Sequence, residues 1–271
     1  MSDDSVAKRL IAVAVPTLTA LAQSGGRVTV TDVGAADGTL LRQLMVDWPD
    51  ELRSVTDWRG IDIRKRPLGL DGCVAWLSGD ILDVAATAPT GPGLIVAHEL
   101  LDDIPCDIVE PDNEGRLRLV LVDPVNGAES IGPALDDHEG CGRWGINGTA
   151  LADWSRTWWP RQEAAARIEV GLSRDIAWQT ISSLVPTGLA IAIDYGHVLP
   201  DRAAGRWDAG TLAAYVDGRP TRPVPDGLRN ITAHVALDAC AAAAPAATTR
   251  LIPPSGGDDF WWLAQTKARS A

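Results

Sequence analysis

The first segment of the chain that could do chemistry is 27–40, which reads RVTVTDVGAADGTL. β-branched residues fill 28–33, as is typical of a buried strand, and apolar residues then recur at helical spacing over 40–48. Gly34 and Gly38 mark the turn between these two patterns. Glycine lets the backbone take a positive φ or approach a ligand closely, and free N–H groups at the start of a helix favour anionic groups. The segment therefore predicts a cofactor-binding turn of the kind that holds a nucleotide; the alternative is a tight turn with no ligand.

Polar residues end three further predicted strands. Strand 55–62 ends at Asp62, strand 73–80 ends at Asp80, and the apolar strand 93–99 ends at Glu99. Ligands of open α/β sheets bind outside the carboxyl ends of the strands, and an acidic residue at a strand end can accept hydrogen bonds from both hydroxyl groups of a ribose. Asp62 is the candidate for that role. Each acidic residue alone is more typical of a helix N-cap or a solvated loop, so the prediction depends on their joint placement.

The spacing of the glycines separates two classes of cofactor. Dinucleotide-binding turns have glycines at positions one, three and six, whereas Gly34, Ala36 and Gly38 stand at positions one, three and five, after Asp32. This spacing is similar to the D-x-G-x-G-x-G turn of class I S-adenosylmethionine (SAM) methyltransferases, with Ala36 in place of the middle glycine. It favours SAM over a nicotinamide cofactor, and so disfavours an oxidoreductase.

Four short strings farther along the chain resemble one family. They are AHELLDDIP at 97–105, AIDYGH at 192–197, GTLAAY at 210–215 and ITAHVALDA at 231–239. In this order they resemble the A-N-E-x-x-D-A-L-P, D-Y-G, G-T-L-R-x-Y and D-x-T-A-x-V-D-F strings of the MidA family of SAM-dependent methyltransferases. That family includes the mitochondrial complex I assembly factor that methylates an arginine. The resemblance implies SAM as cofactor and an α/β fold with the class I methyltransferase (Rossmann-like) sheet flanked by helices.

The resemblance also implies a set of site residues. Asp62 matches the ribose-binding acid, Asp80 the acid near the adenine, and His98 and Glu99 the pair beside the methionine end of SAM. The D-Y-G turn, 194–196, is either part of the site or structural. The residues expected to bind SAM, including immediate neighbours, are Asp32, Gly34, Ala35, Ala36, Gly38, Asp62, Ile63, Asp80, Ile81, His98 and Glu99.

The chain departs from the family pattern at several positions. His98 stands in place of asparagine, Asn230 stands in place of aspartate, and the 210–215 string lacks its arginine. The aromatic segment that the family has near its amino terminus has no counterpart. SAM binding therefore carries over from the family better than the identity of the substrate.

The acceptor of the methyl group is expected at the end of the fourth strand. A guanidinium acceptor needs carboxylates that orient it, and Glu99, Asp102 and Asp103 are the catalytic candidates; Asp102 and Asp103 would alternatively cap a short helix. The resemblance implies transfer to an arginine of a partner protein. The alternative is a degenerate, non-enzymatic protein of the methyltransferase fold that binds or assembles a partner.

Composition limits the partners. The 271 residues are enough for a single domain, 1–271, with an insertion at about 106–184 after the fourth strand, and the net charge of −12 opposes binding to nucleic acid. A negative surface would attract a protein substrate with a basic acceptor. The four cysteines and four histidines show no metal-ligand spacing, so no metal is expected. The sequence leaves the oligomeric state open.

The amino terminus resembles a signal sequence only in part. Asp3 and Asp4 oppose the positive charge that such a sequence needs, and apolar residues at helical spacing over 6–21 instead predict a helix packed on the sheet. We therefore expect a cytoplasmic protein without a membrane partner. The 21 Arg against 3 Lys indicate a GC-rich bacterial genome.

The remaining segments are predicted from pattern. Strands 106–110 and 116–122 should pair, 123–148 should form a long loop that closes over the substrate as a lid, and 196–229 should be irregular. Tryptophans crowd the insertion, where they either fill its core or line an acceptor pocket. The other predicted elements are helices at 151–159, 161–184 and 231–244 and strands at 188–195 and 260–265.

Overall fold

The computed structural model describes residues 3–160, 166–255 and 259–268. The chain folds as two compact units. The first comprises Met1–Leu101, Ile176–Asp194 and Cys240–Ala271, and the second comprises Asp102–Asp175 and Tyr195–Ala239. The chain thus leaves the first unit directly after the fourth predicted strand. It leaves it again after Asp194, so the second unit includes residues beyond the expected insertion at about 106–184.

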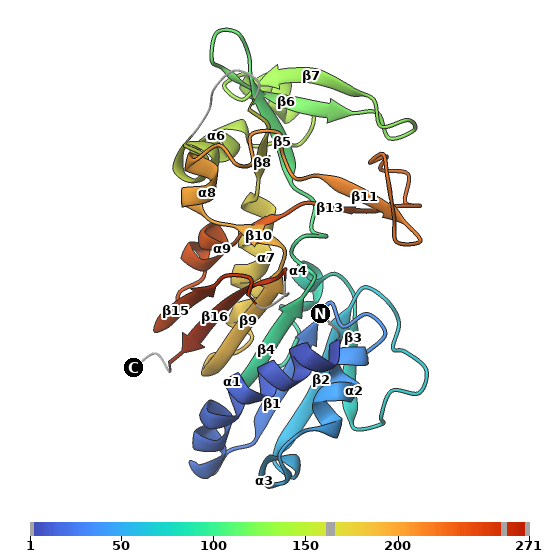
Figure 1. The fold of residues 1–271 in the computed structure, drawn as a ribbon, viewed down its shortest axis with the longest axis vertical. Helices are drawn as coiled ribbons and strands as arrows, with labels where there is room; N and C mark the ends of the chain where they lie inside the picture. Colours follow the sequence, from blue (N-terminus) through green and yellow to red (C-terminus); the bar gives the residue numbers. More distant parts are fainter. Residues whose placement is uncertain (1–2, 161–165, 256–258, 269–271) are drawn as a thin grey trace. The chain divides into compact units, whose positions relative to one another are not determined.

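The first unit is built on a seven-stranded sheet. Its strands are β1 (Val28–Val33), β2 (Thr56–Asp62), β3 (Val74–Ser78), β4 (Gly93–His98), β9 (Gly188–Asp194), β15 (Thr248–Ile252) and β16 (Trp261–Lys267). They lie in the order β15-β16-β9-β4-β1-β2-β3 (Figure 1). The five strands from β3 to β9 run parallel, and β16 runs antiparallel to both of its neighbours.

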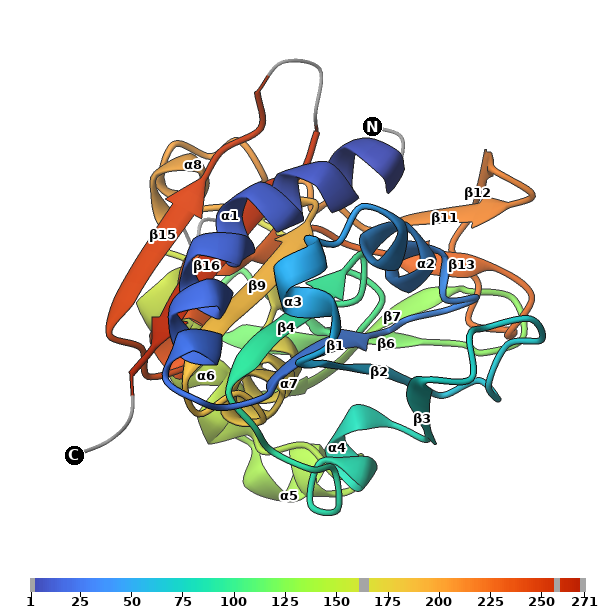
Figure 2. The same ribbon diagram turned by 90° about the horizontal axis from the view of Figure 1, so that it is seen from below.

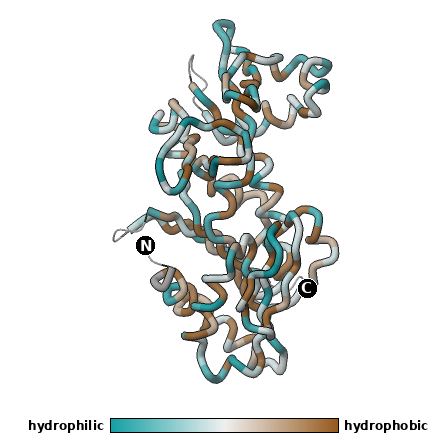
Figure 3. The backbone as a smooth tube through the Cα atoms, turned by 90° about the vertical axis from the view of Figure 1, so that its right-hand side faces the viewer, coloured by the Kyte–Doolittle hydropathy of each residue, from teal (hydrophilic) through white to brown (hydrophobic). Residues whose placement is uncertain are grey.

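The central strands are apolar because both faces of the sheet are covered. Every residue of β9 is buried, and only the last residue of β4 is partly exposed; continuous apolar runs of this kind are typical of parallel strands. Figure 3 shows hydrophobic stretches through the interior of the tube and hydrophilic ones at many of its outer turns. Gly93 and Gly188 begin these two strands, where an added Cβ would lie 1.9 Å from a carbonyl oxygen of the neighbouring strand.

Helix α1 (Asp3–Gln23) lies along this sheet (Figure 2) and packs against β4 and β9. Val6, Leu10, Ala14 and Leu18 are buried at helical spacing, which confirms the predicted amino-terminal helix. Within the described part of the chain, α1 is also the single helix long and apolar enough to cross a membrane by length and composition alone. The other helices that lie wholly in this unit are α2 (Thr39–Val46), α3 (Asp50–Arg53) and α4 (Ile81–Val84). A parallel sheet flanked by helices confirms the predicted α/β fold.

The second unit contains smaller sheets. Strands β5 (Asp107–Pro111), β6 (Leu117–Val122), β7 (Glu129–Ala134) and β8 (Ile168–Val170) form an antiparallel sheet in the order β7-β6-β5-β8. A second sheet joins β11 (Ala213–Val216), β12 (Arg219–Thr221) and β13 (Asn230–Thr232), and β10 (Gly196–His197) pairs with β14 (Val235–Ala236). The helices are α5 (His138–Gly142), α6 (Gly148–Trp158) and α8 (Leu199–Ala203), whereas α7 (Leu172–Ser183) and α9 (Leu237–Ala243) pass from one unit to the other.

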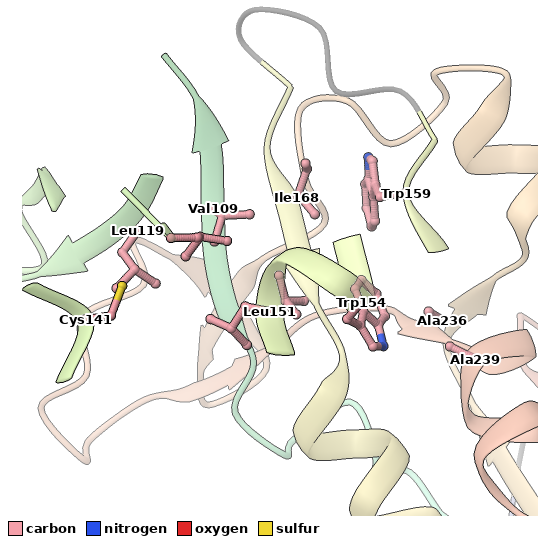
Figure 4. Close-up of a cluster of buried hydrophobic side chains, with 11 residues drawn as sticks. Val109, Leu119, Cys141, Leu151, Trp154, Trp159, Ile168, Ala236 and Ala239 are labelled. Atoms are coloured by element: carbon pink, nitrogen blue, oxygen red, sulfur yellow. The ribbon is translucent and has the colours of Figure 1, made fainter. Parts of the chain in front are cut away.

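A hydrophobic cluster lies in the second unit (Figure 4). Trp154 and Trp159 are buried in it beside Val109, Leu151 and Ile168. These two tryptophans fill the core, which is the first of the two alternatives given for the tryptophan-rich segment. Trp154 also donates a hydrogen bond from Nε1 to the Asp175 carboxylate at 2.7 Å, which satisfies its buried polar atom.

Four predictions of local structure are wrong in whole or in part. The loop expected at 123–148 contains β7 and α5, and Cys141 of α5 is buried in the core, so this segment is not one long loop. The helix expected at 161–184 contains β8 before α7, because Ile168 pairs with Val109 of β5; residues 161–165 lie outside the described part. The helix expected at 231–244 begins with β13 and β14, and the irregular segment 196–229 contains four short elements.

Candidate cofactor site

The carboxyl ends of β1, β2, β3 and β4 meet at one edge of the first unit's sheet. The chain adds β2 and β3 on one side of β1 and then crosses over to place β4 on the other side. Ligands of open α/β sheets bind at such a reversal of strand order, outside the carboxyl ends. The topology therefore places the predicted cofactor residues of all four strands at the edge where a ligand is expected.

The turn after β1 has the backbone geometry that its glycines predict. Gly34 has φ +75° and Gly38 has φ +78°, values that favour glycine. An added Cβ at Gly34 would lie 2.9 Å from Cδ1 of Leu100, so the position is also crowded. Ala36, which replaces the family's middle glycine, has φ +47°. The turn thus keeps a left-handed backbone at Ala36, at a cost of roughly 1–2 kcal/mol for an L-residue.

Asp62 ties the end of β2 to this turn. Its Oδ2 accepts a hydrogen bond from the backbone N–H of Ala36 at 2.7 Å, and its Oδ1 accepts one from the N–H of Arg64 at 2.7 Å. The side chain is buried. Each carboxylate oxygen has a second lone pair, so Asp62 can still accept hydrogen bonds from a ligand such as the two hydroxyl groups of a ribose.

Asp32, near the end of β1, is a second buried carboxyl group. Burial, and to a smaller extent the neighbouring charge of Asp62, together raise the pKa of Asp32 from 3.8 to about 8. A carboxyl group with such a pKa is mostly protonated at neutral pH. The pair therefore combines a neutral acid at Asp32 with the hydrogen-bonded acid at Asp62.

The ends of β2 and β3 present both polar and apolar groups. Asp80 is exposed and caps α4 by accepting a hydrogen bond from the N–H of Leu82 at 2.9 Å, and Ile81 is buried behind it. Ile63, next to Asp62, is 74% exposed. The backbone N–H of Gly79 donates to the carbonyl oxygen of Asp62 at 2.9 Å, which brings the two loops together. The exposed Ile63 supplies an apolar face for a flat ring. Asp80 also has the helix N-cap role that was the alternative to ligand binding.

The end of β4 holds His98 and Glu99. The His98 ring packs edge-on against Phe260 with 5.4 Å between ring centroids, and its Nε2 lies 3.5 Å from Oε1 of Glu99. Glu99 has φ +49°, and its side chain is 47% exposed. Among the described residues, the other non-glycine residues with positive φ are Ala36 and Asp217. Two of these three strained positions thus lie at the sheet edge that carries the candidate site, as is common for functional sites.

Asp194, the acid of the D-Y-G turn, has a structural contact. It is fully buried at the end of β9, and its Oδ2 accepts a hydrogen bond from the backbone N–H of Leu101 at 2.9 Å. The N–H of Glu99 donates to the carbonyl of Ile193 at 2.9 Å. These contacts fix the chain on both sides of Glu99, which favours the structural alternative for Asp194.

The other two catalytic candidates belong to the second unit. The carboxylate of Asp102 is buried and accepts a hydrogen bond from the hydroxyl of Thr232 at 2.7 Å, while its carbonyl oxygen accepts from Ala233 N at 3.2 Å. Asp102 therefore holds the 231–239 string in place. Asp103 is exposed in a turn. Of the three candidates, Glu99 is the one whose exposed carboxylate lies at the sheet edge.

Pattern reasoning missed the residue that links two of the family strings. Glu169 of β8 is buried, and its carboxylate accepts hydrogen bonds from the N–H and hydroxyl of Thr211 and from the N–H of Leu212, at 2.6–2.8 Å. The Thr211 hydroxyl oxygen in turn accepts from the N–H of His234 at 2.8 Å. The strings at 210–215 and 231–239 are thus neighbours in space. A lone acid in an apolar segment gave no signal of this role.

A model of the family described as "Putative S-adenosyl-L-methionine-dependent methyltransferase" matches residues 63–253, which is more than half of the chain. Two solved structures from Burkholderia thailandensis are similar. One is a "likely methyl transferase" bound to S-adenosyl-homocysteine, with 20% identity and a TM-score of 0.68, over 98% of this chain and 76% of that one. The other is an uncharacterised protein with 20% identity and a TM-score of 0.66, over 98% and 78%. No curated protein matches this chain.

The residues of the sheet edge fit SAM. The turn after β1 keeps a left-handed backbone at Gly34, Ala36 and Gly38, Asp62 has lone pairs for a ribose, and Ile63 offers an apolar face for an adenine ring. The family match and this fit confirm the predicted cofactor and the resemblance to the MidA family. The chain belongs to this family of SAM-dependent methyltransferases, and SAM is its cofactor.

Proposed function

We propose that the protein transfers a methyl group from SAM to an arginine side chain of a partner protein. The observation that carries the proposal is the placement of Glu99. It presents a half-exposed carboxylate at the carboxyl end of β4, on a backbone strained at φ +49° and anchored through its N–H to Ile193. A carboxylate pairs well with a guanidinium, because two parallel N–H groups can donate to its two oxygens. The net charge of −12 supports a basic partner.

The chain's own residues would perform three tasks in this reaction. SAM supplies the electrophilic methyl group. Asp62, Ile63 and the turn after β1 would hold the nucleoside part of the cofactor, and His98 would lie beside its methionine part. Glu99 would orient the guanidinium and favour the attacking nitrogen through hydrogen bonds to the other nitrogens. Positioning of this kind is worth on the order of 7–11 kcal/mol in well-aligned reactions.

The test is methyl transfer from radiolabelled SAM to matched peptides. One peptide carries a single arginine, a second carries lysine at the same position, and a third carries citrulline, which keeps the shape of arginine without its charge. Acid hydrolysis then identifies the labelled amino acid. We expect label in methylarginine only, and we expect Glu99→Gln to lower kcat at least tenfold while SAM affinity stays within twofold.

Two results would contradict the proposal. Label on lysine, or on a small molecule and on none of the peptides, would assign the methyltransferase another acceptor. A Glu99→Gln variant with unchanged kcat on the arginine peptide would remove Glu99 from acceptor binding. Asp103→Asn is the matched control, because Asp103 is also an exposed acid near the end of β4 in the sequence and lies in a turn of the second unit.

A further inference from the structure

Five rings pack in a row in the second unit, and we call them the aromatic cluster: Tyr195, His234, Trp207, His197 and Trp159. Adjacent rings have centroids 6.0, 5.1, 5.7 and 5.6 Å apart in that order. Tyr195, His234 and Trp207 are partly exposed, whereas the other two rings are buried. Trp159, the last ring of the row, belongs to the hydrophobic core, and Figure 4 shows it beside Ile168. The cluster therefore extends from the core of the unit to its surface.

The position of the proton on His197 follows from its neighbour. Nη1 of Arg202 lies 2.8 Å from Nδ1 of His197. A guanidinium only donates hydrogen bonds, so Nδ1 must accept, and the neutral ring carries its proton on Nε2. Burial lowers the pKa of His197 well below its ordinary value, and the charge of Arg202 lowers it further. His197 is therefore a neutral ring whose Nε2–H is a donor.

Arg202 is fixed in this position by three other contacts. Its Nη2 donates to Oδ1 of Asp238 at 2.8 Å, its Nε donates to the carbonyl oxygen of Trp158 at 2.6 Å, and its guanidinium lies 5.8 Å from the ring centroid of Trp159. The side chain is fully buried. The arginine cannot turn away without leaving Asp238 without its ion pair, so the tautomer of His197 is set by the fold.

The cluster contains neighbouring buried donors without an acceptor. Nε2 of His197 and Nε1 of Trp207 are both buried, and neither has a hydrogen-bond partner among the described residues. Nδ1 of His234 is likewise buried and has no hydrogen-bond partner among the described residues. An unpaired buried N–H costs about 1–3 kcal/mol, and native proteins seldom leave one without a partner from the protein, an ordered water or a ligand. Two such donors on adjacent rings indicate an acceptor that the cluster is built to receive.

Two arginines lie near the buried end of the cluster: Arg202, which is paired with Asp238, and Arg174. Arg174 is buried, and its guanidinium donates to the carbonyl oxygens of Ile104, Asp102 and His234. Together with Arg202 it lowers the pKa of His197. The charges of Glu169 and Asp102 act on His234, whose pKa they raise against the larger effect of burial. A cation would be repelled beside His197, and an anionic oxygen would be attracted.

We propose that the aromatic cluster binds a carboxylate, whose oxygens accept hydrogen bonds from Nε2–H of His197 and Nε1–H of Trp207. The carboxylate belongs either to a small molecule or to an acidic side chain of a peptide. This site takes an anion, so it is distinct in chemistry from the arginine site proposed at Glu99. The inference does not depend on the identity of the methyl acceptor.

The test uses the protein labelled with ¹⁵N in tryptophan and histidine. The Trp207→Phe variant identifies the indole resonance of Trp207, and long-range ¹H–¹⁵N spectra report the tautomer of His197. The probes are benzoate, as a free carboxylate, and a short peptide amide with one glutamate. Benzamidine, which has the same ring and a positive charge, is the control for charge. Glutamine in place of the glutamate is the control for the peptide.

We expect the Nε2–H tautomer at His197 and a saturable shift of the Trp207 indole with benzoate or the glutamate peptide, and none with benzamidine. Trp207→Phe keeps a ring and removes the N–H, so it should weaken binding at least tenfold. Trp144→Phe is the matched control, because Trp144 is 59% exposed in the same unit and should leave binding unchanged. Stronger shifts with benzoate than with the peptide indicate a small-molecule ligand, and the reverse indicates a peptide.

Three results would overturn the inference. The first is an Nδ1–H tautomer at His197. The second is the absence of a saturable shift with every carboxylate probe at millimolar concentration, with only ordered water in a crystal structure of the soaked protein. The third is binding that Trp207→Phe and Trp144→Phe weaken equally.

Discussion

Asp32 should make the stability of the protein fall as the pH rises. Burial, with the charge of Asp62, raises the pKa of Asp32 from 3.8 to about 8. A group with a raised pKa binds its proton more tightly in the folded state, so its favourable contribution is complete below pH 3.8 and is lost as the pH rises towards 8. Each pH unit in that window costs about 1.4 kcal/mol, and the whole window about 6 kcal/mol.

The perturbation that tests this reasoning is Asp32→Asn, which keeps the shape of the side chain and cannot ionise. Urea unfolding of both proteins between pH 5 and pH 9 gives the difference in free energy of unfolding at each pH. The free energy of unfolding of the variant should rise relative to that of the wild type by about 1.4 kcal/mol per pH unit up to about pH 8. Above that pH the difference between the two proteins should be constant. In an Asp62→Asn background the slope should be the same, but the pH at which the difference becomes constant should move down. It should move only in part towards 3.8, because burial is the larger cause of the raised pKa. A difference that is the same at every pH would refute the reasoning.

Three further predictions concern single contacts. Gly34→Val should lower SAM affinity at least tenfold in calorimetry and destabilise the protein by about 2 kcal/mol. The reason is that it places a branched residue at φ +75°, with its Cβ 2.9 Å from Leu100. Unchanged affinity would mean that the turn is not the cofactor site. Asp62→Ala should raise the Kd for SAM at least tenfold by equilibrium binding, since the N–H of Ala36 loses its acceptor, and a change below twofold would exclude a ribose contact. Asp194→Ala should lower the free energy of unfolding in urea by about 1–3 kcal/mol, because the N–H of Leu101 needs a buried acceptor. Asp194→Asn keeps an acceptor oxygen and should lower it by less. Equal effects of both variants would contradict the role of Asp194 as that acceptor.

The sheet could be predicted from the sequence because its signals are local. The β-branched run at 28–33, the later apolar strands and the acid that ends β2 each reflect burial within a few residues. The glycine turn was also readable, since Gly34 and Gly38 need positive φ. The sequence alone did not show that Ala36 would keep a left-handed backbone without a glycine.

The second unit was less predictable because its elements are short and held by distant partners. Three-residue β8 looked helical with the residues that follow it, yet Ile168 pairs with Val109, which is 59 positions away in the chain. The expected loop at 123–148 forms β7 and α5 because Cys141 packs into the core. Likewise, the contact between Glu169 and Thr211 joins segments with no shared pattern. Pattern reasoning sees none of these pairings.

The most direct test of the central claim is calorimetric titration of the purified protein with SAM, S-adenosylhomocysteine and NAD. The account predicts one-to-one binding of SAM and S-adenosylhomocysteine in the micromolar range, strongly weakened in Asp62→Ala, and no binding of NAD. Binding of NAD alone, or SAM affinity that Asp62→Ala leaves unchanged, would contradict the assignment of the cofactor to the carboxyl edge of the sheet.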